Sequence, residues 1–351
     1  MNLESYLKGI FGEDVNLIDK EEIGREETIK DFGYGKPYLI RFKRDGETGN
    51  VVLSTMKGDS FGHDHFSDRA QTLLWQHHSF NRLPKHVKSL DVGFFTKDGE
   101  MRSAGDAEEF FLLTDLVEGE PYANDLDRIR KTGRLEEFDM VRVKRLSSYL
   151  SEIRAVKRDD PKLYLRKIRD TVGHGECIFG LTDSYPENLD YITPEELCGI
   201  EERCVKLRWK LKGYKKRLCM VHGDFHPWNI LFRPDNDFTL LDRSRGEWGE
   251  AADDLSSLTM NYIFYSLLSR GEMGGSFEKL FIEFYRDYMD KTGDIEILNV
   301  IQLFYVFRAL VVASPVWYPD ISKVVRKKLF NFVWSMLDCE EFDYEDINRY
   351  L

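Results

Sequence analysis

The sequence is poor in cysteine, and the cysteines that it has show no paired spacing. Five cysteines are spread over 351 residues, without a CxxC motif. An odd number of cysteines without such spacing argues against both a disulfide framework and a thiolate zinc site. This usage is typical of a reducing compartment, and we expect a cytoplasmic protein.

The sequence also lacks a long apolar run and an excess of basic residues. The longest apolar stretch, near residues 309–316, is much shorter than a membrane-spanning helix, and no basic segment followed by an apolar one opens the chain. We therefore expect no membrane association. Acidic residues outnumber basic ones by 62 to 50, for a net charge of −12. This balance argues against nucleic acid as a partner.

Apolar residues are plentiful enough for more than one core. They make up 42% of 351 residues, a length that exceeds the usual single core and predicts two lobes. Residues 27–57 alternate apolar and polar positions around glycine-bearing turns at 33–35 and 45–46. This pattern predicts an antiparallel meander of about three strands.

A helix and a second pair of strands are predicted after the meander. Apolar positions recur at helical intervals over residues 70–77, and two β-type runs follow at 90–95 and 109–113. Glycine and proline directly after the last run indicate a connector, so we place a lobe boundary after residue 117.

Most of the remaining chain is predicted to be helical. The spacing of apolar residues predicts a helix over 138–153. Thr193, Pro194 and Glu196 have the pattern of a helix start, and the helix should run to about Gly213. The chain is thus expected to be α+β, with a sheet-plus-helix lobe at 1–117 and a larger, mainly helical lobe at 118–351.

The segment His222-Gly-Asp-Phe-His-Pro-Trp-Asn229 carries the strongest chemical signal. Asp224 and Asn229 stand five positions apart after a short β run at 218–221. This is the spacing of a kinase catalytic loop, in which a carboxylate orients an acceptor hydroxyl and takes its proton while an amide oxygen binds Mg²⁺. Asp242 ends a second β run and is a further candidate Mg²⁺ ligand.

An isolated HGD tripeptide is most often a turn that the aspartate caps. Here it belongs to an ordered series, in which a strand, the loop, a turn, a second strand, Asp242 and then Asp254 follow one another. The series favours phosphoryl transfer over a simple turn.

The segments HGDFHPWNILF and LLDRSRGEWGEAADDLSSL resemble the aminoglycoside phosphotransferase and choline-kinase-like family of small-molecule kinases. The resemblance extends over most of the chain. It implies a bilobal protein-kinase-like fold that binds ATP or GTP between the lobes, with the N-terminal lobe on the phosphate side. It also implies Asp224 as catalytic base, Asn229 and Asp242 as Mg²⁺ ligands, and His222 packed behind the loop.

Asp254 has two interpretations. The resemblance implies that its carboxylate braces the catalytic loop through the loop backbone, whereas its position at a helix start is equally typical of an N-cap.

The chain departs from the family pattern after Asp242. Arg243 and Arg245 follow it, with no aromatic residue beside the acid. The two arginines contact either phosphate or an anionic substrate, or else they pair with the nearby Glu247, Glu250 or Asp253. Both interpretations stay open.

The N-terminal lobe gives weaker signals. Gly33 and Gly35 form either a phosphate-covering loop or an ordinary hairpin turn. Lys57 is the preferred phosphate-binding lysine, with Lys43 as its competitor, and Asp68 on the following helix is its candidate partner.

The connector between the lobes is expected to contact the base. In such kinases backbone groups read the base, here at Thr114, Asp115 and Leu116, so no base preference follows. The histidine-containing runs at 62–65 and 173–176 are more typical of solvated loops and helix ends than of metal sites.

The sequence therefore predicts a Mg²⁺- and nucleotide-dependent phosphotransferase with a small-molecule alcohol acceptor. One alternative is a catalytically silent nucleotide-binding module. Another is a kinase for protein-linked or glycated substrates. The segment between Asp242 and Asp254, of about a dozen residues, argues against it because it is too short for a long peptide-docking loop. The acceptor and the oligomeric state are not indicated.

Overall fold

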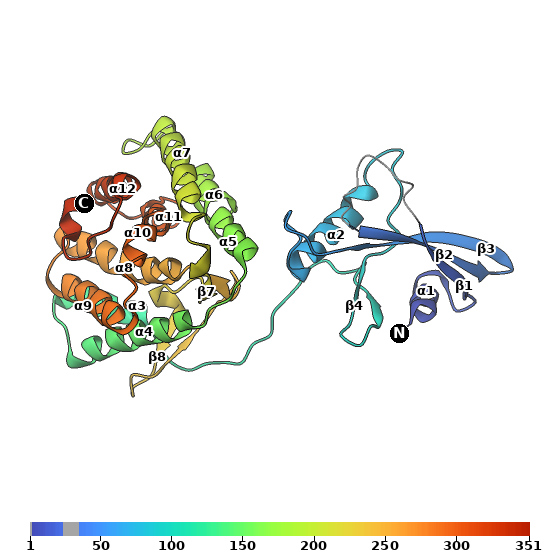
Figure 1. Cartoon of the computed structure of the whole chain (residues 1–351), viewed down its shortest axis with the longest axis horizontal. Helices are drawn as coiled ribbons and strands as arrows, with labels where there is room; N and C mark the ends of the chain where they lie inside the picture. The colour runs from blue at the N-terminus through green and yellow to red at the C-terminus, as the bar shows by residue number, and fades with distance from the viewer. Residues whose placement is uncertain (1, 24–34) are drawn as a thin grey trace. The chain divides into compact units, whose positions relative to one another are not determined.

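The computed structural model describes residues 2–23 and 35–351 and divides into two compact units, Met1–Thr114 and Asp115–Leu351 (Figure 1). The predicted fold class is confirmed, because small antiparallel sheets recur in both units and the second unit is mainly helical. The boundary predicted after residue 117 falls a few residues after this division.

Outside residues 24–34, the N-terminal unit contains a three-stranded antiparallel sheet in the order β1-β2-β3, a separate hairpin and two helices. Their bounds are α1 Leu3–Phe11, β1 Asn16–Glu22, β2 Gly35–Arg44, β3 Glu47–Met56, α2 Phe66–Phe80, β4 Gly93–Phe95 and β5 Met101–Ser103.

The meander is confirmed, although it begins earlier than predicted. Its first strand is β1, and residues 27–34 of the predicted stretch lie outside the described residues. Between β2 and β3, Asp45 and Gly46 both have positive φ, 53° and 84°. Two such residues form the tight turn whose twist matches that of the paired strands.

The core of this unit is small. Leu7 of α1 and Val15 pack with Ile40 and Phe42 of β2, all of them buried. Helix α2 confirms the helix predicted over 70–77, but none of its side chains is fully buried. Packing therefore holds α1 on the sheet more firmly than it holds α2.

The prediction of a strand at 109–113 is wrong. The strand that pairs with β4 is β5, and residues 109–113 have no regular structure, with Leu113 88% exposed. High β propensity makes no strand without a hydrogen-bonding neighbour. The Asp98-Gly99 turn, with Gly99 at φ 78°, is the local signal that marks the hairpin.

The C-terminal unit is built from helices, with two small antiparallel sheets in the orders β6-β8-β9 and β10-β7. The bounds are β6 Glu120–Pro121, α3 Tyr122–Thr132, α4 Glu137–Ala155, α5 Pro161–Gly173, α6 Ile178–Ser184, α7 Pro194–Leu211, η1 Lys215–Arg217, β7 Cys219–Met220, η2 Pro227–Asn229, β8 Ile230–Phe232, β9 Phe238–Leu240, β10 Trp248–Gly249, α8 Ala251–Arg270, α9 Gly275–Thr292, α10 Ile297–Val300, α11 Gln302–Ala313, α12 Lys323–Asp338 and η3 Ile347–Tyr350.

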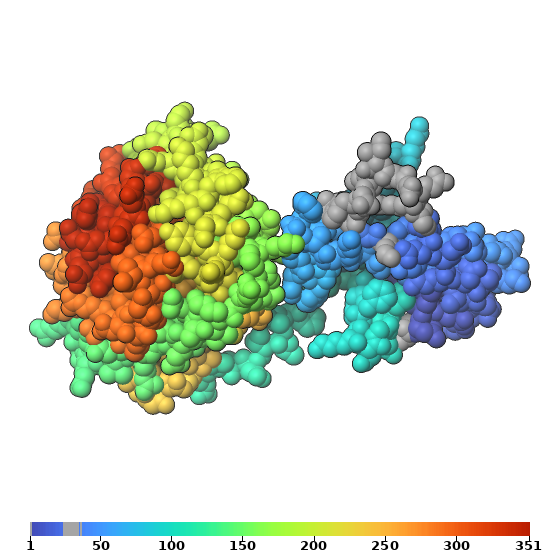
Figure 2. Space-filling model, viewed as in Figure 1, coloured from blue at the N-terminus to red at the C-terminus, as the bar shows by residue number. Residues whose placement is uncertain are grey.

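Helix α8 forms the centre of this unit. It is buried on nearly all sides, and it packs against α3, α9 and α11 (Figure 1). In Figure 2, atoms of α7 (yellow), α9 (orange) and α12 (red) lie on the face of this unit that is turned toward the viewer. No helix in the described ranges is long and apolar enough to cross a membrane.

The predicted helices of this unit are confirmed as α4 and α7. At the start of α7 the Thr193 hydroxyl accepts the Glu196 N–H at 3.2 Å, and the Glu196 carboxylate accepts the Thr193 N–H at 2.8 Å. This is the reciprocal pair of bonds that the sequence predicts.

Candidate active site

The catalytic-loop segment follows β7 after one intervening residue, Val221, and ends in η2. Its second residue, Gly223, has φ 91°, and a Cβ atom there would lie 3.2 Å from Cβ of Arg245. Glycine is thus required for both its backbone conformation and the close approach of Arg245.

The Asp254 carboxylate braces the start of this loop. It accepts the backbone N–H groups of His222 and Gly223, each at 2.8 Å, and the side chain is buried. The N-cap of α8 is Glu250, so Asp254 does not have the capping role that the sequence left open. Burial, and then the charge of Asp253, raise the pKa of Asp254 to about 7, and its two N–H bonds only partly oppose this shift.

The Asp224 carboxylate lies between two nitrogen donors. Its Oδ1 accepts a hydrogen bond from Nη1 of Arg308 at 2.6 Å, and its Oδ2 lies 3.4 Å from Nε2 of His226. Burial by itself would raise the pKa of Asp224, but His226 and Arg308 outweigh it and hold this pKa well below its usual range. The carboxylate is therefore ionised at neutral pH.

His222 lies behind the loop. The ring is buried, and its Nδ1 accepts the Asp224 N–H at 3.3 Å. Burial lowers the pKa of His222, against a hydrogen bond with the Leu241 backbone that raises it. A neutral ring bonded to the backbone on both sides holds the loop in place.

The β8–β9 hairpin brings the two candidate metal ligands to one end. Leu241 donates its N–H to the Asn229 carbonyl at 2.9 Å, and Asp242 is the next residue. The Asn229 side-chain NH₂ group donates to the Asp224 carbonyl at 3.1 Å, which leaves its Oδ1 as the atom for a cation.

Asp242 is exposed and has a positive φ of 52°. Few residues other than glycine adopt this conformation, and such positions are concentrated at functional sites. An exposed carboxylate at the same end of the hairpin as Asn229 suits Mg²⁺, which prefers oxygen ligands and keeps several waters.

The two arginines after Asp242 differ in their contacts. Nη2 of Arg243 donates to the carbonyls of Val221 and Glu247, at 2.7 and 3.3 Å, so this side chain holds the loop rather than a carboxylate. Arg245 stacks over the Phe307 ring at 5.0 Å. Within the described ranges no carboxylate lies within ion-pair distance of Arg245, and its charge lowers the pKa of Asp224.

The described residues of the N-terminal unit that are predicted to contact the nucleotide lie at the start of β2, directly after β3 and in the first turn of α2. Gly33 lies outside the described residues, and Gly35 begins β2, where a Cβ would lie 1.7 Å from the Thr55 carbonyl oxygen. Lys57 directly follows β3 and is exposed. The Asp68 carboxylate accepts the His65 N–H at 2.8 Å and thereby helps to start α2.

The side chains of the connector residues indicate little about nucleotide binding. Thr114, Asp115 and Leu116 are exposed and lie at the division between the units, without regular structure. Their nucleotide contacts, like those of Lys57 and Asp68, stay predictions.

The histidine-containing runs have local roles. His65 caps α2, and His174 ends α5, with its Nδ1 accepting the Glu176 N–H at 3.2 Å. In the described part of the chain, no group of three His, Cys, Asp or Glu side chains is arranged to hold a metal.

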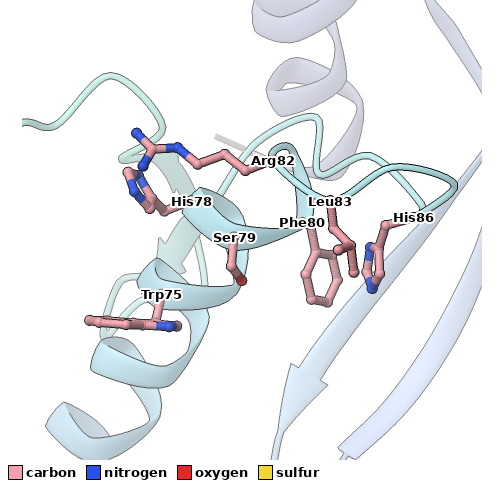
Figure 3. A pocket seen from close by; sticks show the side chains of 7 residues that line it. All are labelled: Trp75, His78, Ser79, Phe80, Arg82, Leu83 and His86. Carbon is pink, nitrogen blue, oxygen red and sulfur yellow. The ribbon is translucent and has the colours of Figure 1, made fainter.

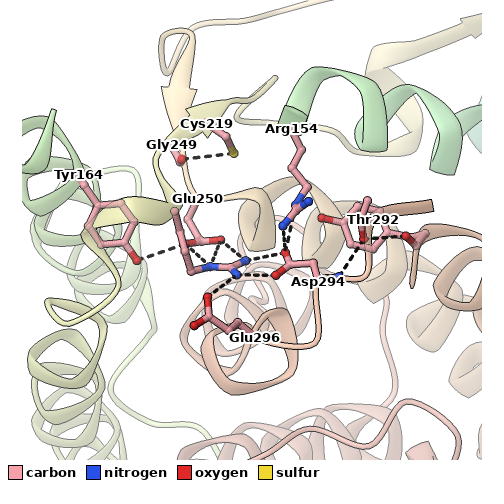
Figure 4. Close-up of polar contacts among 10 residues, drawn as sticks. Arg154, Tyr164, Cys219, Gly249, Glu250, Thr292, Asp294 and Glu296 are labelled. Atoms are coloured by element: carbon pink, nitrogen blue, oxygen red, sulfur yellow. Dashed lines mark hydrogen bonds and ion pairs between the residues drawn. The ribbon is translucent and has the colours of Figure 1, made fainter. Parts of the chain in front are cut away.

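A buried ion-pair network supports the strand before the loop, and sequence reasoning missed it. Arg217 binds Glu250 and Asp294 at 2.8 and 2.6 Å. Tyr164 and Arg154 approach these two acids from opposite sides (Figure 4), at 3.2 Å for Tyr164 to Glu250 and 2.6 Å for Arg154 to Asp294. The network joins segments far apart in sequence and fixes the end of the β7–β10 pair at which Cys219 lies opposite Gly249.

Arg308 was also missed. It is the single charged residue of α11, a helix otherwise made almost entirely of apolar side chains. A lone arginine in such a helix is the sequence signal that marks it, because a charge is rarely buried unless it is paired.

A surface hollow of about 580 Å³ lies in the N-terminal unit, at the end of α2. Figure 3 shows Phe80, Leu83 and His86 together on one side of it, with the rings of Phe80 and His86 4.3 Å apart. None of the candidate site residues lines this hollow.

No protein-family model matches the chain, and no curated protein does. Among solved structures, a Plasmodium vivax ethanolamine kinase is 12% identical with a TM-score of 0.36, over 95% of this chain and 80% of its own. An amicoumacin kinase solved with AMP-PNP and Ca²⁺ is 14% identical with a TM-score of 0.42, over 99% and 97%. A choline kinase from Cryptosporidium parvum is 11% identical with a TM-score of 0.35, over 97% and 88%.

These structures are small-molecule kinases.

Proposed function

We propose that the chain is a Mg²⁺-dependent phosphotransferase that moves the γ-phosphoryl group of ATP or GTP to a hydroxyl of a small molecule. Asp224 orients the acceptor hydroxyl and takes its proton, while Asn229 and Asp242 hold the metal.

One observation carries this proposal. The loop and the β8–β9 hairpin are linked by hydrogen bonds from Asn229 to Asp224 and from Leu241 to Asn229, at 3.1 and 2.9 Å. These bonds hold a partly buried carboxylate, an amide and an exposed carboxylate in one small region. A base beside a pair of oxygen ligands is the donor set that phosphoryl transfer requires.

In this proposal Asp224 first orients the acceptor hydroxyl and then takes up its proton. Since its pKa is lowered, Asp224 is ionised when the acceptor arrives and accepts a hydrogen bond from its hydroxyl. A base this weak takes the proton late, once the bond from the acceptor oxygen to phosphorus is forming. Mg²⁺ and the nucleotide, when bound, supply the phosphoryl group and neutralise its charge.

The metal assignment is tested by calorimetry of nucleotide binding with and without Mg²⁺. Asp242→Ala should abolish the gain in affinity that Mg²⁺ gives the wild type. Asp235→Ala, an exposed acid at the turn of the same hairpin, is the matched control and should keep that gain. Equal Mg²⁺ dependence in all three proteins would refute the assignment.

A further inference from the structure

Arg308 is buried in the middle of α11, with 6% of its surface exposed. A guanidinium in such a position is costly unless its N–H groups find acceptors. Nη1 donates to Oδ1 of Asp224 at 2.6 Å, and Nη2 donates to the Gly223 carbonyl at 3.2 Å and to Oδ1 of Asp253 at 2.7 Å. Two of these three acceptors belong to the catalytic loop.

The third acceptor ties the loop to the central helix. Asp253 lies in the first turn of α8, next to Asp254, which braces the same loop from its backbone side. Arg308 thus joins α11, α8 and the loop at the residue proposed as the base. Its Nε is buried without an acceptor in the described part of the chain, so the planar group is held through its other two nitrogens.

The two oxygens of Asp224 are therefore unequal. Oδ1 is fixed by a short charge-assisted bond to Arg308, whereas the contact of Oδ2 with Nε2 of His226 is longer, at 3.4 Å. Nδ1 of His226 accepts the Trp228 N–H at 3.2 Å, so a neutral ring carries its proton on Nε2. Among the described residues this weak donor is the only one that Oδ2 has, so Oδ2 retains capacity to accept another hydrogen bond.

We propose that Arg308 is the positioning residue of the active site, which clamps Oδ1 of Asp224 so that Oδ2 receives the acceptor hydroxyl. This role rests on the proposed function. Arg308 also offsets the repulsion among three neighbouring acids, Asp224, Asp253 and Asp254. It forms ion pairs with the first two of them. Without Arg308 the pKa of Asp224 would rise, because burial raises it and one of the cations that oppose burial would be gone, with His226 and Arg245 remaining.

The test compares Arg308→Lys and Arg308→Met with the wild type, in steady-state kinetics over a range of pH. Lysine keeps the charge but not the planar fork, so kcat should fall roughly 10- to 100-fold while the acid limb of the pH profile stays in place. Methionine removes both, so kcat should fall by about 100-fold or more and the acid limb should move to higher pH. KM for the nucleotide should change by no more than about threefold in either variant.

Arg217→Lys is the matched control, because Arg217 is also a buried arginine bound to two acids and does not contact Asp224. It should lower stability without moving the acid limb. A folded Arg308→Met variant with wild-type kcat and an unmoved acid limb would overturn the positioning role alone. A folded wild type that binds Mg²⁺-nucleotide but turns over no acceptor would overturn the proposed function, and this role with it.

Discussion

Replacing Asp254 by asparagine tests how the catalytic loop is held. The wild-type carboxylate accepts two buried N–H groups, from His222 and Gly223, each at 2.8 Å. Asparagine has one acceptor oxygen, so one of the two N–H groups loses its partner and faces an NH₂ group instead. A buried N–H without an acceptor costs about 1–3 kcal/mol. Asp254→Asn should therefore be destabilised, with a displaced loop and a reduced kcat.

The effect on stability should depend on pH in a defined direction. Because burial beside Asp253 raises the pKa of Asp254 from its ordinary 3.8 to about 7, the folded state holds the proton more tightly than the unfolded state. The stability contributed by this proton is fully present below about pH 4 and is lost as the pH rises to 7. Over pH 5 to 8 the wild type should lose about 3 kcal/mol through this group, at 1.4 kcal/mol per unit.

Urea unfolding of both proteins at several pH values measures this directly. Asparagine does not titrate, so the advantage of the wild type over Asp254→Asn should shrink steadily from pH 5 to 7 and then level off. The contribution of Asp224 is common to both proteins and titrates below this window. A constant difference in unfolding free energy across the range would refute the raised pKa, and an unchanged kcat would refute the brace.

Two further substitutions test the supports of the loop. Gly223→Ala forces an alanine to φ 91° with its Cβ about 3.2 Å from Arg245. This variant should lose about 1–2 kcal/mol of unfolding free energy, and its kcat should fall at least tenfold. Unfolding and kinetic data indistinguishable from those of the wild type would contradict the close approach. Arg217→Met leaves Glu250 and Asp294 buried without their main cation and should cost about 3–5 kcal/mol in thermal or chemical unfolding, whereas a loss below 1 kcal/mol would mean that the network contributes little.

The sequence predicts well the features that depend on residues close to one another in the chain. The capping residues Thr193 and Glu196, the Asp45-Gly46 turn and the helix of α4 each depend on a few neighbouring positions, and the structure has all of them. The close positions of Asn229 and Asp242 follow in the same way, because a single hairpin joins them.

The features that it does not predict depend on contacts between distant segments. Arg308 reaches Asp224 across 84 positions of sequence, and Arg217 reaches Asp294 across 77. Nothing near either arginine identifies its partner. The strand predicted at 109–113 failed for the same reason, since a strand exists only where another segment pairs with it.

Turnover by Asp224→Asn tests the central claim most directly. Nucleotide consumption would be measured for the wild type and the variant against a library of amines, sugars and other hydroxyl compounds, with Mg²⁺-nucleotide binding measured in parallel. Asparagine cannot take the proton, so the variant should bind Mg²⁺-nucleotide and lose about 100-fold or more of kcat. A folded variant that binds nucleotide and keeps the wild-type kcat would contradict the assignment of Asp224 as the base.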